Sequence, residues 1–372
     1  MRPFDRSRPP WEAVLVEGLP NGRAAYLVKL HHSLTDGLGA VQLLEQLHSR
    51  HPEPPAEDAP DLHSAATADG GPRMAAGGAA GPLDVLAHQL RHDVASVPGL
   101  LRAAGAGVLG AVSDPPGTVR SATRYASSLR RLLRPPAAEP SPLLAARGVA
   151  WRFLALDVPL RDLRAAARVA GGTLHDAYLA ALLGGYRRYH AALGQPVDTL
   201  PVAIPISVRR PGDPAGGNRI TATRFAAPVG TADPKTRIQR VRELILAVRG
   251  EPALGSSVGL MFPTLARLPG ALSTQLVGSV TKGNDLQASF VPGMRDDRYL
   301  AGARVERVYP FAPRPGCPAM ITLATYQDVG CVGVNFDPVS FSRPELFTRC
   351  LLDGFTEVLG LHPGSAAPRV RG

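Results

Sequence analysis

The chain has little of what would indicate a secreted, membrane-spanning or metal-binding protein. Its 3 cysteines, Cys317, Cys331 and Cys350, are too scattered for a disulfide framework, so we expect a reducing, cytoplasmic setting. No basic segment followed by an apolar core opens the chain, and no apolar run reaches the roughly 18 residues that a bilayer-spanning helix needs. Because the three cysteines have no ligand-like spacing and no Cys-x-x-Cys occurs, we expect no bound metal.

Signals for nucleic-acid binding are also missing. The 41 basic and 31 acidic residues leave a net charge of +10, yet no nucleic-acid-binding module and no basic patch with interleaved aromatic residues is present. A basic surface can instead attract phosphate groups, such as those of anionic lipids. We therefore expect no nucleic-acid partner.

Composition divides the 372 residues, which suffice for two domains. Residues 1–50 form an N-terminal part and 51–82 a flexible loop rich in Pro, Ala and Gly. Residues 83–140 read as a linker of basic amphipathic helices, 141–362 as a C-terminal half, and 363–372 as a disordered tail. Such helices can lie on a membrane surface or pack an apolar stripe on their own protein.

Apolar spacing predicts alternating strands and helices in the C-terminal half. We expect strands at 151–156, 202–207, 321–326 and 331–336, and helices at 160–170, 174–192 and 344–359. This alternation predicts an α/β sandwich in each half of the protein.

The segment from His31 to Gly37 carries the chemistry. It follows an apolar strand at Ala24–Leu30 and precedes a one-sided apolar helix from Leu38 to Leu47. Because strand residues alternate in direction, one histidine of the pair can face a cavity and the other the packed interior. Histidine suits general-base work near neutral pH, although a purely structural pair is an open alternative.

This segment, HHSLTDG, matches the HHxxxDG motif of the superfamily that includes chloramphenicol acetyltransferase, carnitine acyltransferases and peptide-synthetase condensation domains. Further segments resemble those of bacterial wax ester synthase/diacylglycerol acyltransferases, and the chain is identified as a member of that family. They are residues 3–12 (PFDRSRPPWE), 173–181 (TLHDAYLAA), 205–209 (PISVR), 217–220 (GNRI), 291–293 (VPG) and 299–303 (YLAGA).

The resemblance implies an α/β fold of two chloramphenicol-acetyltransferase-like sandwich halves with a channel between them. It also implies an acyl-CoA-dependent O-acyltransferase that esterifies diacylglycerol, long-chain alcohols or both. Acyl-CoA is then a co-substrate, and no bound cofactor is expected. Peripheral contact with the inner membrane face or with lipid droplets is a further expectation.

By position in the motif, His32 is the expected general base and His31 packs against or orients it. Asp36 is either a triad-like carboxylate or a structural group that fixes the loop, with Arg209 as a candidate ion-pair partner. Gly37 would permit a tight turn or a positive φ. Ser33 lacks a Gly-x-Ser-x-Gly elbow, so direct transfer in a ternary complex is expected.

Other candidates come from the remaining segments. His175 stands where the family usually has asparagine, and Asp176 either supports the site or interacts with a helix N-terminus. Ser207 and Arg209 are expected to line the channel or bind phosphate, and Asn218 to orient backbone or make a turn. Ser289 and Phe290 replace the family's Ser-Asn pair, a second departure.

The N-terminal part is short for the family, because only 30 residues precede His31. We expect either a start upstream of Met1 or a shortened first half with exposed sheet edges and apolar surface. Two alternatives to the lipid acyltransferase therefore stay open. One is a truncated, non-catalytic paralogue that binds lipid or a partner, and the other is a condensation-like acyltransferase of a specialised metabolite.

Overall fold

The structure is a computed structural model, which describes residues 4–5, 8–53, 115–133, 136–207, 220–251, 275, 278 and 281–371. Its strands are β1 Trp11–Leu19, β2 Arg23–Leu30, β3 Arg152–Pro159, β4 Leu200–Ser207, β5 Ile220–Ala227, β6 Leu286–Val291, β7 Tyr299–Leu300, β8 Ala303–Arg304, β9 Ala319–Tyr326, β10 Val329–Phe336 and β11 Arg369–Arg371. Its α-helices are α1 Gly37–Leu47, α4 Pro115–Leu133, α5 Leu160–Val169, α6 Leu174–Ala192, α7 Pro234–Arg249 and α10 Pro344–Leu359, with short 3₁₀ turns at Pro20–Gly22 and Pro142–Leu144.

Contacts divide the chain into two compact units. The larger unit combines Leu30–Glu53 with Leu129–Gly372, and the smaller combines Arg2–Lys29 with Pro54–Ser128. The histidine motif and α1 are thus grouped with the C-terminal residues and not with the strands that precede them. This grouping differs from the predicted division, in which the motif belonged to a separate N-terminal half ending at residue 50.

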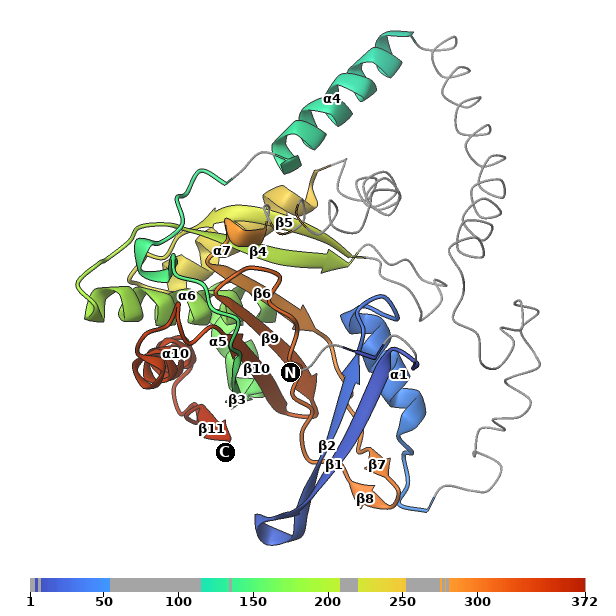
Figure 1. The fold of residues 1–372 in the computed structure, drawn as a ribbon. Coiled ribbons are helices and arrows are strands. Elements are labelled where there is room, and N and C mark those ends of the chain that lie inside the picture. Colours follow the sequence, from blue (N-terminus) through green and yellow to red (C-terminus); the bar gives the residue numbers. More distant parts are fainter. Residues whose placement is uncertain are drawn as a thin grey trace. The chain divides into compact units, whose positions relative to one another are not determined.

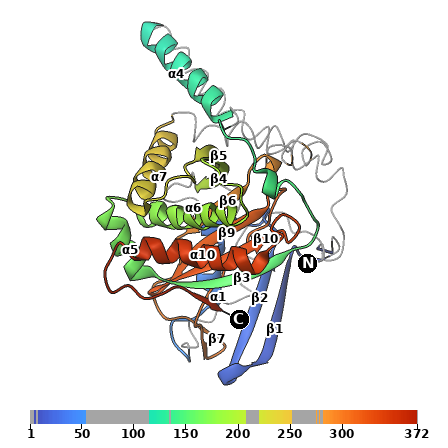
Figure 2. The same cartoon turned by 90° about the vertical axis from the view of Figure 1, so that its left-hand side faces the viewer.

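A seven-stranded mixed sheet forms the centre of the larger unit, in the order β11-β3-β10-β9-β6-β4-β5. The β4–β6 and β6–β9 pairs are parallel and the other pairs are antiparallel. Helices α5, α6, α7 and α10 cover one face (Figures 1 and 2). Alternate strand residues, such as Ile204, Ala288 and Ile321, point into this helix-covered core and are fully buried.

Local sequence explains where the helices begin. A capping box starts α6, because the Thr173 side chain accepts from the Asp176 N–H while Asp176 accepts from the Thr173 N–H. Asp233 caps α7 by accepting from the Thr236 N–H at 2.8 Å. Proline at the first helical position of α7 and α10 supplies a fixed φ without losing an intrahelical hydrogen bond.

The predicted elements of the C-terminal half are confirmed. Helices α6 and α10 have the predicted bounds, and α5, β4, β9 and β10 agree within two residues. Strand β3 runs to Pro159, beyond the predicted Leu156, because it pairs with β10 along its whole length. Helix α4 lies within the predicted basic helical linker, whereas residues 83–114 and the loop at 54–82 lie outside the described residues.

The prediction of a disordered tail at 363–372 is wrong for its described part. Residues Arg369–Arg371 form β11, which pairs antiparallel with β3. The Arg371 Nε donates to Asp157 Oδ2 at 2.7 Å. Ladder pairing and this ion pair order a segment whose polar composition alone indicates no structure.

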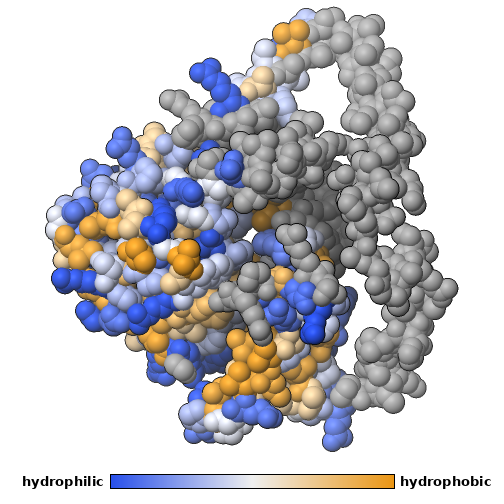
Figure 3. All heavy atoms as spheres, viewed as in Figure 1, coloured by the Kyte–Doolittle hydropathy of each residue, from blue (hydrophilic) through white to orange (hydrophobic). Residues whose placement is uncertain are grey.

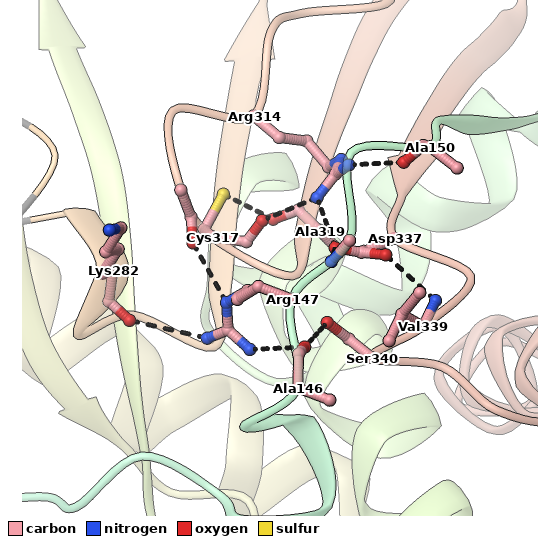
Figure 4. A network of polar contacts seen from close by, with 12 residues as sticks. Ala146, Arg147, Ala150, Lys282, Arg314, Cys317, Ala319, Asp337, Val339 and Ser340 are labelled. Carbon is pink, nitrogen blue, oxygen red and sulfur yellow. Dashed lines mark hydrogen bonds and ion pairs between the residues drawn. The ribbon is translucent and has the colours of Figure 1, made fainter.

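The stretch before β3 is tied to the larger unit by a polar network (Figure 4). The Arg147 guanidinium donates to the carbonyls of Ala146, Lys282 and Gly316. Asp337 accepts from the Gly148 N–H at 2.7 Å and lies 3.5 Å from Arg314 Nη1. The chain therefore enters the sheet through a fixed segment.

The smaller unit presents a two-stranded antiparallel hairpin of β1 and β2. Lys29 of β2 pairs with Glu12 of β1 at 3.3 Å. Large apolar side chains on both strands are exposed, and Figure 3 shows apolar surface over this hairpin. They are Trp11, Val14, Leu15, Val16, Leu19, Tyr26 and Leu27. Apolar surface is thus exposed on this hairpin.

Candidate functional site

The histidine pair lies in a turn between β2 and α1. The predicted strand ends at Leu30, and His31 to Leu34 turn, closed by a hydrogen bond from the Leu34 N–H to the His31 carbonyl at 3.0 Å. Both histidines are exposed, so the expectation that one of them faces the packed interior is wrong. The alternation of a strand no longer applies, because the pair lies beyond the last strand residue.

A local contact fixes the His31 ring. The Ser33 N–H donates to His31 Nδ1 at 3.2 Å, and the Ser33 hydroxyl lies 2.7 Å from the same nitrogen. These two contacts set the orientation of the His31 ring directly before His32.

Asp36 occupies the N-cap of α1. Its buried carboxylate accepts from the Gly39 N–H at 3.0 Å, and its carbonyl accepts from the Ala40 N–H at 2.8 Å. The carboxylate also faces the positive end of the helix dipole. This geometry favours the structural alternative for Asp36, while its candidate partner Arg209 lies outside the described residues.

Gly37 is needed for close approach and not for a positive φ. It is the first residue of α1 and is absent from the described glycines with positive φ, so that part of the prediction is wrong. A Cβ at Gly37 would lie 2.8 Å from Cγ2 of Val291, the last residue of β6. The missing side chain lets the start of α1 sit directly against the end of this strand.

The rest of α1 packs on the face of the sheet opposite the other helices. Val41 and Leu44 contact a buried cluster of Met294, Tyr326 and Cys331, and the last two point away from the helix-covered core. Glu45 pairs with Arg298 at 3.1 Å. Beyond α1, Ser49 and Tyr299 exchange two backbone hydrogen bonds of 3.0 and 2.9 Å.

Two of the segments that resemble the acyltransferase family thus hold the helix that follows the histidine motif. The Val291–Gly293 segment contacts its beginning and the Tyr299–Ala303 hairpin its end. Gly293 lies so close to Thr325 that a Cβ would meet its carbonyl oxygen, and the hairpin turns through positive φ at Ala301 and Gly302.

His175 and Asp176 lie on the other side of β6 from the motif. The His175 ring stacks on Phe290, with centroids 5.9 Å apart, and Phe290 packs on the helix-covered core. The next strand residue, Val291, points the opposite way and contacts Gly37. The structure therefore separates these two predicted support residues from His31–Gly37 by the sheet itself.

Asp176 has a structural environment. It completes the capping box of α6, and its Oδ2 lies 3.4 Å from Arg242 Nη1. Burial lowers the pKa of His175 to about 4, although Asp176 opposes the shift, so the ring is neutral near neutral pH. Its Nε2 is buried without a hydrogen-bond partner.

The remaining predicted residues are only partly described. Ser207 is exposed at the end of β4, opposite Ile220 of β5, and Arg209 and Asn218 lie outside the described residues. Sequence reasoning missed Arg298, which no local pattern distinguishes from other arginines. It also missed Thr322, whose buried hydroxyl has no hydrogen-bond partner and which pairs in register with Ser289 on the α1 side of the sheet.

Two hollows are described among the residues of the larger unit. One hollow of about 240 Å³ is lined by residues between Thr356 and Ala367, and another of about 440 Å³ lies between β5 and α7. Neither includes a motif residue, so the channel stays a prediction.

In the described ranges, no group of three or more His, Cys, Asp or Glu side chains could hold a metal ion. No described helix has the length and apolarity to cross a bilayer. The three cysteines are free and buried.

Comparison with protein families gives two matches along the chain. Residues 1–178 match the wax ester synthase/diacylglycerol acyltransferase catalytic domain, and residues 216–358 match the C-terminal domain of the same family. Together these ranges include the histidine motif and the β6–β10 region that holds α1.

Individual proteins agree with the family matches. A protein of Mycobacterium tuberculosis (strain ATCC 25618 / H37Rv), provisionally named a diacylglycerol O-acyltransferase, is 42% identical over 372 residues, covering 99% of this chain and 72% of its own length. A second protein of that strain, with the same provisional name, is 30% identical over 351 residues, covering 89% and 63%.

Among solved structures, the wax ester synthase/diacylglycerol acyltransferase from Marinobacter aquaeolei VT8 superposes with a TM-score of 0.58 at 19% identity. The match covers 96% of this chain and 73% of that one. At this identity the similarity concerns the fold, and it confirms the predicted α/β class.

Proposed function

The chain belongs to the wax ester synthase/diacylglycerol acyltransferase family, and we propose that it transfers a long-chain acyl group from acyl-CoA to the hydroxyl of diacylglycerol or a fatty alcohol. Its family membership makes it an acyltransferase. The donor, the acceptors and the roles of individual residues are our proposal.

One arrangement carries the proposal: an exposed histidine pair in a short turn whose far end is fixed to a packed helix. The Asp36 cap and the Gly37–Val291 contact hold the turn where α1 begins. A catalytic group on a loop gains accuracy when a rigid element holds that loop. The His32 side chain is thus exposed while its backbone is constrained.

In the proposed reaction, the alcohol oxygen attacks the thioester carbonyl while His32 takes the hydroxyl proton. The tetrahedral intermediate then expels the coenzyme A thiolate, which receives the proton from His32. Such general-base help contributes about 10²–10⁴-fold to rate. No acyl-enzyme forms, so both substrates are bound together.

His31 and Asp36 act on the geometry of the turn in this scheme. The Ser33 contact orients the His31 ring beside His32. Asp36 links the turn to the helix N-terminus and does not touch the reacting atoms. The net charge of +10 favours approach of the phosphates of acyl-CoA.

The test is an assay of the purified full chain with palmitoyl-CoA and either dioleoylglycerol or hexadecanol. We expect ester formation with at least one acceptor and a strong loss of it in His32→Ala. Equal turnover in the wild type and in His32→Ala would exclude the general-base role.

The exposed apolar hairpin favours a second candidate, a non-catalytic lipid-binding protein. Residues such as Trp11 and Leu15 are more than half exposed on β1. Binding of lipid vesicles together with no ester formation by the wild type would support this candidate over the enzyme.

A further inference from the structure

We infer that Arg298 and Glu45 form a positioning pair, which holds the helix behind the histidine motif in the orientation that the proposed acyl transfer requires. The inference rests on the proposed function. It concerns a residue of the C-terminal half, about 250 positions away along the chain from the glutamate that it contacts.

Burial sets this ion pair apart from the exposed ones. The Arg298 side chain is 5% exposed, whereas that of Glu45 is 41% exposed. Arg298 Nη2 donates to Glu45 Oε1 at 3.1 Å, and Arg298 Nε is buried without a hydrogen-bond partner. The buried cation thus has its carboxylate partner on α1.

The backbone at Arg298 is fixed independently of α1. Its N–H donates to the Tyr326 hydroxyl at 3.2 Å, and that hydroxyl donates to the Val305 carbonyl at 2.8 Å. The Val305 N–H in turn donates to the Arg298 carbonyl at 2.8 Å. The backbone of Arg298 is therefore anchored to β9, and only its side chain extends to Glu45.

The pair acts between two other contacts of the same segment. Gly37 abuts Val291 at the start of α1, and Ser49 is bonded to Tyr299 after its end. Together with the packing of Val41 and Leu44, the Glu45–Arg298 pair restrains rotation of the helix about its axis. Because Asp36 caps the same helix, a rotation of α1 moves the turn that carries His32.

Because Arg298 is more deeply buried than Glu45, removing one partner of the pair should have a different effect from removing the other. Without Glu45, the Arg298 cation would stay buried and uncompensated, which is strongly unfavourable. Without Arg298, the half-exposed Glu45 carboxylate would turn to solvent. We therefore expect Glu45→Gln to disturb α1 more than Arg298→Met, and the double variant to recover part of the loss.

The experiment compares Glu45→Gln, Arg298→Met and their combination with the wild type. Amide hydrogen exchange over residues 38–47 should speed up on the order of tenfold in Glu45→Gln. In the acyl-transfer assay, kcat should fall on the order of tenfold while KM for palmitoyl-CoA changes less than twofold, because small misplacements of catalytic groups affect rate more than binding. Glu45→Asp and Arg298→Lys are milder variants that should retain part of kcat.

Arg304→Ala is the matched control. It removes a nearby arginine, in β8, whose exposed guanidinium pairs with Asp297 at 2.9 Å. It should leave exchange in α1 and kcat near wild-type values.

Unchanged exchange in α1 in Glu45→Gln would overturn the inference, as would an equal effect of Arg304→Ala. If the wild type makes no ester, the proposed function fails, and the exchange comparison still decides whether the pair holds the helix. Loss of kcat with a proportional loss of folded protein would also contradict positioning.

Discussion

At the scale of single residues, the histidine motif is a strand end, a turn and a helix cap in immediate succession. His31 is oriented by Ser33, Asp36 caps α1, and Gly37 leaves space for Val291. Each of these groups has a structural task that can be tested separately from the proposed chemistry of His32. Gly37 gives the sharpest steric prediction.

Gly37→Ala should destabilise the protein by about 1–3 kcal/mol, because its Cβ would lie 2.8 Å from Val291 Cγ2 and valine adjusts poorly. Chemical denaturation measures the effect. The double variant Gly37→Ala/Val291→Ala should lose less stability than the two single variants lose together, since the smaller side chain at position 291 removes the clash. Strict additivity would show that the two residues do not meet.

At the scale of elements, polar contacts fasten short segments that lack a core of their own. Strand β11 is held to β3 by three residue pairs and by Asp157, which also accepts from Arg307 and Tyr309. Burial raises the pKa of Asp157, but hydrogen bonds from Tyr309, Arg371 and Arg307 outweigh it and hold that pKa below its usual value.

Asp157→Ala should therefore cost about 2–3 kcal/mol, because three donors lose their acceptor. Arg371→Ala should cost less than about 1 kcal/mol, since its side chain is 40% exposed. Because the pKa of Asp157 is lowered in the folded state, its contribution is present at neutral pH and is lost as pH falls through the folded pKa. Equal losses for the two variants at pH 7 would contradict this account.

Elements with strong local signals were predictable from the sequence, and those without them were not. Helices α6 and α10 were predictable because long apolar stripes and their start signals agree. Helix α7 was not predicted, since its arginines hide the apolar face, and one of them, Arg237, is fully buried against the Ala180 carbonyl and Glu357. Strand β11 is too short for any periodic signal.

The candidate site likewise combines features that local sequence predicts with features that it does not. Local motif residues were predictable, because the strand, turn and helix lie next to one another in sequence. The contacts of α1 with Arg298 and Tyr299 depend on tertiary packing, as does the separation of His175 from the motif by β6. No local pattern carries this information.

At the scale of the whole molecule, buried ionisable groups make stability depend on pH. Burial raises the pKa of Asp285 to about 6, opposed by a hydrogen bond from the Ser141 N–H and by Arg147. One carboxylate oxygen, Oδ1, is buried without a hydrogen-bond partner. The nearby His190 is hydrogen-bonded to Ser141, with 2.8 Å between His190 Nε2 and the Ser141 hydroxyl oxygen. Burial lowers the pKa of His190.

Because the folded pKa of Asp285 exceeds the unfolded value, the folded state binds more protons between pH 4 and 6. Its contribution to stability is therefore full below the unfolded pKa and falls by about 3 kcal/mol as pH rises through 6. Asp285→Asn should gain stability relative to the wild type over this range. Denaturation curves at pH 4, 5, 6 and 7 measure the difference in free energy of unfolding between the two proteins. Because both contain His190, the titration of His190 cancels in this difference. A difference that stays constant with pH would contradict the prediction.

The most direct test of the account is the rate of coenzyme A release from palmitoyl-CoA in the presence of dioleoylglycerol or hexadecanol. His51→Ala, which removes another exposed imidazole, is the control and should match the wild type. We predict that His32→Ala lowers kcat by about 10²–10⁴-fold while the protein stays folded. A His32→Ala variant that releases coenzyme A and forms ester as fast as the wild type would contradict the central claim.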